Sequence, residues 1–187
     1  MRETRDTSRQ NMSSAANEQL FRACAMLNLA GIRQALDEGA DIGAADRCGR
    51  TVLDIVTENA FLKHERYDDC VDGRVRDIVQ TLLENGAAPD GAADETTPLV
   101  TFVHRSFPIS KLLVEHGAKV NFAADGDAVL DHLLDEIAVY GKDTPVGRFR
   151  GYAQTLELLE RRGALTYSEQ QEKRERLREM QKRWRGK

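Results

Sequence analysis

The sequence predicts an all-α protein built from about four repeated pairs of helices, and three observations support this fold class. First, a Gly-Ala pair closes four separate apolar segments, at Gly39, Gly86, Gly117 and Gly163. Second, three of these pairs are followed by a short acidic stretch ending in Ala-Ala-Asp, and then by a turn and a new apolar segment. Third, no alternating apolar run of useful length indicates a strand. A pattern that returns along a chain indicates a repeat architecture.

Each repeat is predicted to contain a turn, two helices and a glycine cap. The closing glycine can adopt the left-handed conformation that ends a helix at little steric cost. Thr51 and Thr97 are candidate N-cap residues, because a hydroxyl can accept a hydrogen bond from a free amide of the first helical turn. Pro98 fits the first helical position, where a missing N–H costs nothing.

The pattern resembles the ankyrin repeat on the segments GADIGAADRCGRTVLD at 39, TPLV at 97 and LLVEHGAKVN at 112. The resemblance covers roughly residues 17–165, and it implies a solenoid of about four helix pairs. Where the family has a histidine after threonine, proline and leucine, this chain has Asp54, Val100 and Asp131. We expect the two aspartates to accept hydrogen bonds from nearby amides instead.

The spacing of the glycines differs from the family pattern. They lie 47, 31 and 46 residues apart, whereas the family repeat is about 33 residues long. The segment GRVRDIVQTL at 73 parallels GRFRGYAQTL at 147 within the two long repeats. We therefore expect the second and fourth helix pairs to be extended, with insertions between the two helices of each pair.

Two terminal segments flank the repeats. Residues 1–16 are polar and are expected to be disordered, whereas residues 166–187 are predicted to form a basic amphipathic helix. Its apolar residues Leu177, Met180 and Trp184 follow one another at intervals of three and four residues. The favoured interpretation is a helix that covers the end of the last repeat. The alternatives are contact with an acidic protein or a membrane surface, and less favourably with nucleic acid.

Charge is unevenly distributed along the chain. Residues 17–167 carry 25 acidic residues and 16 Lys or Arg, a net charge of −9, and residues 168–187 carry a net charge of +4. An acidic repeat array argues against nucleic acid as its partner and favours a basic protein.

No apolar stretch approaches the ~20 residues of a membrane span, and the N-terminus has no apolar core of a secretory signal. Three cysteines without zinc-like spacing favour free thiols in a reducing compartment. The expected location is cytoplasmic, and a secreted effector stays open as an alternative.

Catalytic signals are weak. No Gly-rich phosphate loop, nucleophile elbow or paired-acid constellation is present, so we expect no enzyme activity, no cofactor and no small-molecule substrate. Metal-capable residues do cluster in one loop, but their spacing fits no standard zinc site. They are His64, Asp68, Asp69, Cys70 and Asp72. A solvated acidic loop is favoured over a metalloprotein with a site around His64 or His132.

The predicted function is therefore non-catalytic binding of a protein, as the resemblance implies. An inhibitor or antitoxin that masks a basic enzyme surface, or a bacterial effector, is the alternative. Candidate contacts on the concave surface and finger tips are Asp46, Arg47, Arg50, Asp94, Glu95, Asp125 and Asp127. Candidate contacts on the edge formed by the long repeats are Tyr67, Tyr140, Arg148 and Arg150. For the arginines, pairing with the acid-rich array is the favoured alternative to partner contact.

Overall fold

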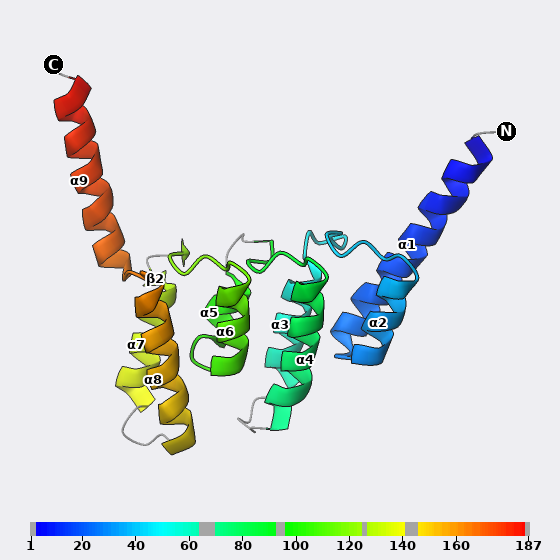
Figure 1. The fold of residues 1–187 in the computed structure, drawn as a ribbon, viewed down its shortest axis with the longest axis horizontal. Helices are drawn as coiled ribbons and strands as arrows, with labels where there is room; N and C mark the ends of the chain where they lie inside the picture. The colour runs from blue at the N-terminus through cyan, green and yellow to red at the C-terminus, as the bar shows by residue number, and fades with distance from the viewer. Residues whose placement is uncertain (1–2, 64–69, 93–95, 125–126, 141–145, 186–187) are drawn as a thin grey trace. The chain divides into compact units, whose positions relative to one another are not determined.

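The computed structural model of the chain describes residues 3–63, 70–92, 96–124, 127–140 and 146–185 (Figure 1). Over these ranges the chain is mostly helical, with one short β-hairpin, and the predicted all-α class is confirmed. No helix within them is both long enough and apolar enough to cross a bilayer.

The elements follow one another as consecutive helices interrupted by the hairpin. In chain order they are α1 (Glu3–Ala25), α2 (Leu29–Asp37), α3 (Val52–Lys63), α4 (Cys70–Glu84), α5 (Pro98–Phe102), α6 (Phe107–Glu115), β1 (Ala123–Ala124), β2 (Asp127–Ala128), α7 (Val129–Tyr140), α8 (Val146–Arg161) and α9 (Tyr167–Arg185).

The chain forms two compact units. The first consists of Met1–Pro98 with Leu112–Ala118, and the second of Leu99–Lys111 with Lys119–Lys187.

The first compact unit has a core to which each of its four long helices contributes. Helix α1 packs against α2 and α3, and α4 packs against α2 and α3. Leu20, Ile32, Leu53 and Ile78, one from each helix, are all 0% exposed. Full burial of such a side chain contributes about 1.5–3 kcal/mol, so these contacts hold the four helices together.

The second compact unit contains α7, which packs against α8 and against β2. Strands β1 and β2 are antiparallel, with Ala123 opposite Ala128. The sequence did not predict this hairpin, because two-residue strands are too short to show an alternating pattern. Leu133 of α7 and Leu159 of α8 are both 0% exposed.

The predicted glycine caps are confirmed in all four places. Gly39, Gly86, Gly117 and Gly163 have φ between +72° and +95°. Each glycine N–H donates to the carbonyl three residues earlier, and the N–H of the following alanine donates to the carbonyl five residues before it. This is the Schellman pattern, which satisfies carbonyls that the last helical turn leaves unpaired.

The second and fourth helix pairs are longer than the third but not longer than the first. Helices α3 and α4 have 12 and 15 residues, and α7 and α8 have 12 and 16, whereas α5 and α6 have 5 and 9 and α1 and α2 have 23 and 9. Leu53, Leu99 and Leu130 occupy the same position in successive repeats, and they are 0%, 0% and 7% exposed.

The N-terminus differs from the expectation of disorder. Helix α1 begins at Glu3 and continues to Ala25, so most of residues 1–16 belong to a helix. Residues 1–30 contain neither Gly nor Pro, and nothing in them interrupts a helix that its C-terminal half anchors by packing.

Candidate partner-binding site

The loop between α2 and α3 is organised around the carboxylate of Asp46. Its Oδ1 accepts hydrogen bonds from the backbone N–H groups of Cys48 at 2.8 Å and Arg50 at 3.0 Å. Its Oδ2 accepts from Nε and Nη2 of the Arg50 side chain at 2.9 and 2.7 Å. The backbone N–H of Asp46 donates to the carbonyl of Arg50 at 2.9 Å, so the turn closes on itself.

Arg50 extends this network from the loop to the next helix. Its Nη1 forms an ion pair with Oε2 of Glu58 in α3. Partial burial raises the pKa of Asp46, but the hydrogen bonds from the Arg50 side chain and from the Arg50 and Cys48 backbones, with the Arg50 charge, outweigh it. The pKa of Asp46 therefore lies below its ordinary value. Asp46 and Arg50, both predicted partner contacts, hold this loop in shape.

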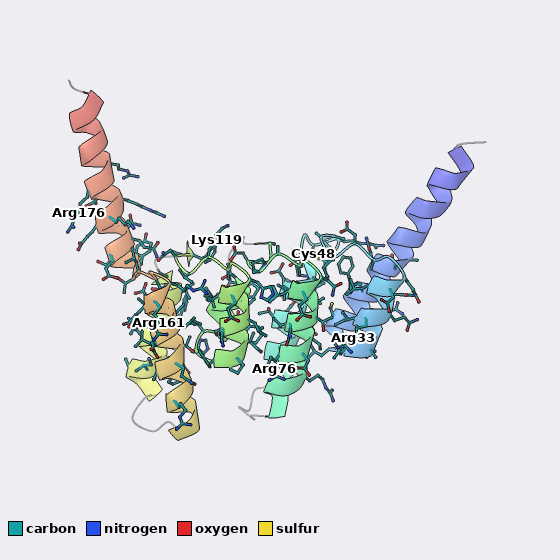
Figure 2. The ribbon with its side chains drawn as sticks, viewed as in Figure 1. Arg33, Cys48, Arg76, Lys119, Arg161 and Arg176 are labelled. Atoms are coloured by element: carbon teal, nitrogen blue, oxygen red, sulfur yellow. The ribbon has the colours of Figure 1, made fainter. Side chains whose placement is uncertain are left out.

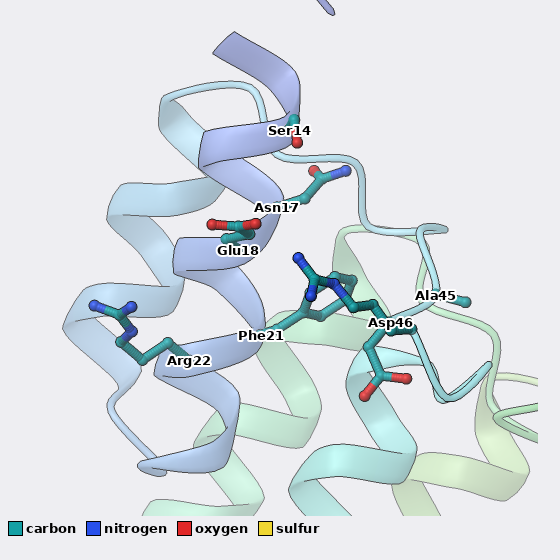
Figure 3. A pocket seen from close by; sticks show the side chains of 8 residues that line it. Ser14, Asn17, Glu18, Phe21, Arg22, Ala45 and Asp46 are labelled. Carbon is teal, nitrogen blue, oxygen red and sulfur yellow. The ribbon is translucent and has the colours of Figure 1, made fainter. Parts of the chain in front are cut away.

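A groove of about 760 Å³ lies between α1 and this loop. Figure 3 shows Asn17 and Phe21 pointing from α1 toward the part of the loop that carries Ala45 and Asp46. Oδ1 of Asn17 accepts a hydrogen bond from the backbone N–H of Asp41 at 2.7 Å, which fastens the loop to α1. The groove is lined by Ser14, Asn17, Glu18, Phe21, Arg22, Ala45, Asp46 and Arg47.

The groove combines one half-buried aromatic ring with charged groups of both signs. Phe21 is half-buried, while Glu18, Arg22 and Arg47 are exposed. Such a surface can hold a peptide segment by one apolar contact and several polar ones, in the manner of a protein interface with a mixed rim.

The α1 side of the groove was missed by the sequence analysis. Its residues recur at positions 14, 17, 18, 21 and 22, which is the spacing of one helix face. That periodicity was a usable signal. The polar composition of residues 1–16, which is typical of disorder, conceals this face.

Asp54 and Asp131 accept hydrogen bonds from backbone amides, as predicted. Oδ2 of Asp54 accepts from the backbone N–H of Thr51 at 2.8 Å and from that of Ala92, 38 residues away, at 2.9 Å. Oδ2 of Asp131 accepts from the N–H of Ala128 and from that of Tyr167, 36 residues away, both at 2.8 Å. Each carboxylate thus ties the start of its own helix to a segment that follows the second helix of the pair.

The remaining predicted contacts are distributed as follows. Arg47 lies exposed in the first loop, Asp127 lies exposed at the start of β2, and Arg150 lies exposed on α8. Of these three residues, Arg47 lines the groove. Outside the described residues lie Tyr67, Asp94, Glu95, Asp125 and the side chains of Tyr140 and Arg148.

The arginine pair of the second repeat flanks a buried residue, as expected. Val75 is buried, Arg74 and Arg76 are exposed, and Nη2 of Arg76 pairs with Oδ1 of Asp77 at 2.9 Å. The acidic pairing favoured for these arginines therefore occurs at Arg76, with a neighbour on its own helix.

Metal-capable side chains do not gather among the described residues: no group of three or more His, Cys, Asp or Glu is close enough there to hold an ion. The loop cluster from His64 to Asp72 lies outside the described side chains. His132 of α7 is half-buried and belongs to no such group.

Comparison with known proteins adds no identification, because no protein-family model and no curated protein matches this chain.

Proposed function

We propose that this chain is a non-catalytic protein-binding module of the ankyrin-repeat kind, and that it binds a basic protein segment in the groove between α1 and the first loop. The observation that carries the proposal is the groove itself, about 760 Å³ in volume and lined by a half-buried Phe21 among exposed charges. Aromatic and arginine side chains are the types enriched at binding hot spots, and both line this groove.

The repeated loop geometry supports the choice of a binding scaffold. The connecting segments are held by backbone hydrogen bonds that recur at four glycine turns. Two aspartates add a further hydrogen bond each, to a segment that follows the second helix of the pair. A loop that is rigid before binding loses less conformational entropy when a partner docks on it.

The charge of the chain supports a basic partner. Residues 17–167 have a net charge of −9. Glu18 lines the groove, and the exposed residues Glu38 and Asp41 lie in the loop that forms its other wall. Opposite charge on a partner raises the rate of association and excludes acidic competitors.

Site-specific cross-linking tests the proposal. A photo-reactive residue at Ala45, in the groove, should capture a basic protein from a native lysate, and an excess of unmodified chain should compete with the capture. The same residue at Glu84, exposed at the end of α4, is the position control. Capture of the same proteins from both positions would contradict the proposal.

A charge reversal distinguishes binding in the groove from attraction by the overall charge of the chain. Glu18→Lys should weaken binding of the captured protein by about tenfold, as expected for loss of a rim ion pair and its replacement by repulsion. Glu157→Lys makes the same charge change on an exposed position of α8 and should leave binding unchanged. If the captured protein is an enzyme, assaying it with added chain tests the inhibitor alternative.

A further inference from the structure

Hydrogen bonds fasten the C-terminal helix α9 at its first turn. Oε2 of Glu169 accepts from the backbone N–H of Thr166 at 2.8 Å, and the N–H of Glu169 donates back to the Thr166 hydroxyl, which is the reciprocal arrangement of a capping box. The N–H of Tyr167 donates to Asp131, and the buried side chain of Gln170 donates to the carbonyl of Leu165 at 3.1 Å. These bonds fix where α9 begins.

Beyond that turn, the described side chains of α9 do not pack on the protein. Residues 172–176 are all exposed, as is Arg178. Five consecutive residues pass through more than one full turn at about 3.6 residues per turn, so every direction around this part of the helix faces solvent. Figure 2 shows Arg176 projecting from it. The described side chains of residues 172–176 and Arg178 therefore do not cover the last helix pair, and the three apolar residues of the favoured expectation, Leu177, Met180 and Trp184, lie outside the described side chains.

The cations of α9 divide into those that follow a glutamate by four residues and a stripe of those that do not. Glu172 lies four residues before Arg176 and pairs with it at 3.6 Å, and the same spacing relates Glu169 to Lys173 and Glu179 to Arg183. The cations without such a glutamate recur at steps of four, four and three residues, which places them along one side of the helix. They are Arg174, Arg178, Lys182 and Arg185.

A second stripe is apolar. Leu177, Met180 and Trp184 recur at steps of three and four residues, and this spacing places them on a face that adjoins the cation stripe. A helix with cations beside an apolar stripe that includes Trp has the composition of helices that lie in the headgroup region of a bilayer.

We propose that α9, from Glu172 to Arg185, docks on an anionic lipid surface. The cation stripe meets the lipid phosphates, while Leu177, Met180 and Trp184 enter the boundary of the acyl chains. A nucleic acid, or an acidic protein surface without an apolar groove, would match the cation stripe only, and it would leave the apolar stripe in water. The net charge of +4 over residues 168–187 supplies the attraction.

Trp184 is the only tryptophan of the chain, and it reports on this docking directly. With vesicles of phosphatidylcholine containing about 30% phosphatidylserine, the full chain should co-sediment and its emission should shift to the blue. Vesicles of phosphatidylcholine alone should give neither effect. A blue-shifted emission without vesicles, or no binding to anionic vesicles at low salt, would overturn the proposal.

A tail variant measures the contribution of the cation stripe. It carries Arg174→Gln, Arg178→Gln and Lys182→Gln. Because each cation near an anionic membrane contributes about fivefold in affinity, the triple change should weaken vesicle binding by about 100-fold. Thermal unfolding followed by circular dichroism should match that of the unmodified chain, since the exposed part of α9 does not pack on the rest of the protein.

A body variant is the matched control. It removes the same number of cations from exposed positions outside α9, by Arg33→Gln, Arg74→Gln and Arg162→Gln. Vesicle binding of the body variant should be unchanged. Equal weakening of both variants would assign the binding to general electrostatics and overturn the proposal. The proposal would also be overturned if vesicles leave the emission of Trp184 unshifted and the chain instead self-associates or binds an oligonucleotide in a way that the tail variant abolishes.

Discussion

Replacing Asp54 by alanine should destabilise the first compact unit by about 2–4 kcal/mol. Oδ2 of Asp54 accepts from the backbone N–H of Thr51 at 2.8 Å, from the Thr51 hydroxyl at 2.9 Å and from the N–H of Ala92 at 2.9 Å. A hydrogen bond to a charged group contributes about 1.5–3 kcal/mol, and three bonds to one half-exposed oxygen contribute less than their sum. The predicted loss of about 2–4 kcal/mol therefore equals the contribution of one to two such hydrogen bonds.

Gly91 provides a second way to measure the same contact. Its φ is +63°, and a Cβ at this position would lie 1.9 Å from Oδ1 of Asp54. Gly91→Ala should therefore cost about 1–2 kcal/mol for the left-handed backbone and more for displacing the carboxylate. When Asp54 is already alanine the collision is gone, so the double variant should be less destabilised than the sum by about 1 kcal/mol or more.

Gly86 is the matched control for this cycle. Its φ is +93°, and a Cβ added to it would meet nothing within 4 Å. Gly86→Ala combined with Asp54→Ala should be additive within about 0.5 kcal/mol. Urea unfolding followed by far-ultraviolet circular dichroism gives all the free energies. A cost for Asp54→Ala below about 0.5 kcal/mol, or additivity with both glycines, would refute the assigned bridge.

Two further predictions concern thiol reactivity and pH. Burial raises the pKa of Cys24 to about 12, whereas Cys48 is exposed, so in a Cys70→Ser protein iodoacetamide should alkylate Cys48 rapidly. Cys24 should react only in denaturant, and equal rates for the two thiols would contradict the structure. Because the pKa of Asp46 is lowered in the fold, its carboxylate stabilises the chain above about pH 4, and this is lost as pH falls through the lowered pKa. The melting temperature should therefore exceed that of Asp46→Asn at pH 7, and the difference should disappear toward pH 2; a pH-independent difference would argue against the assigned network.

Much of the fold could be predicted because it depends on local sequence. The four closing glycines were assigned from their position after an apolar segment, where only a left-handed residue ends the helix well. Leu53 could be placed in the core and Thr166 at a helix start for the same reason, since helical period and capping chemistry act within one or two turns.

The candidate site was harder to predict, because its contacts join residues far apart in the chain. The amide oxygen of Asn17 bonds to the loop 24 residues later, and that of Asn121 accepts from Leu165, 44 residues later. No local pattern indicates either partner. The sequence indicates only that Asp46 and Arg50 are surface charges, because their spacing in a loop does not predict that the two side chains bond to each other.

The turn at Leu27 could not be predicted from the sequence for a different reason. It has φ +53°, and the N–H groups of Leu27 and Asn28 donate to the carbonyls of Cys24 and Ala23, as at the glycine turns. A leucine at this conformation is strained by about 1–2 kcal/mol, and burial of its side chain offsets the strain. Sequence signals mark such a turn only when glycine occupies it.

The glycine turns have the same geometry whatever the length of the helices that they join. The helices between successive turns range from five residues in α5 to sixteen in α8, yet every repeat closes through the same two backbone hydrogen bonds. Residues can therefore be gained between the helices of a pair without altering the junction that follows. For protein engineering, the connections from α3 to α4 and from α7 to α8 are suitable graft points for a peptide tag, whereas the glycine junctions are not.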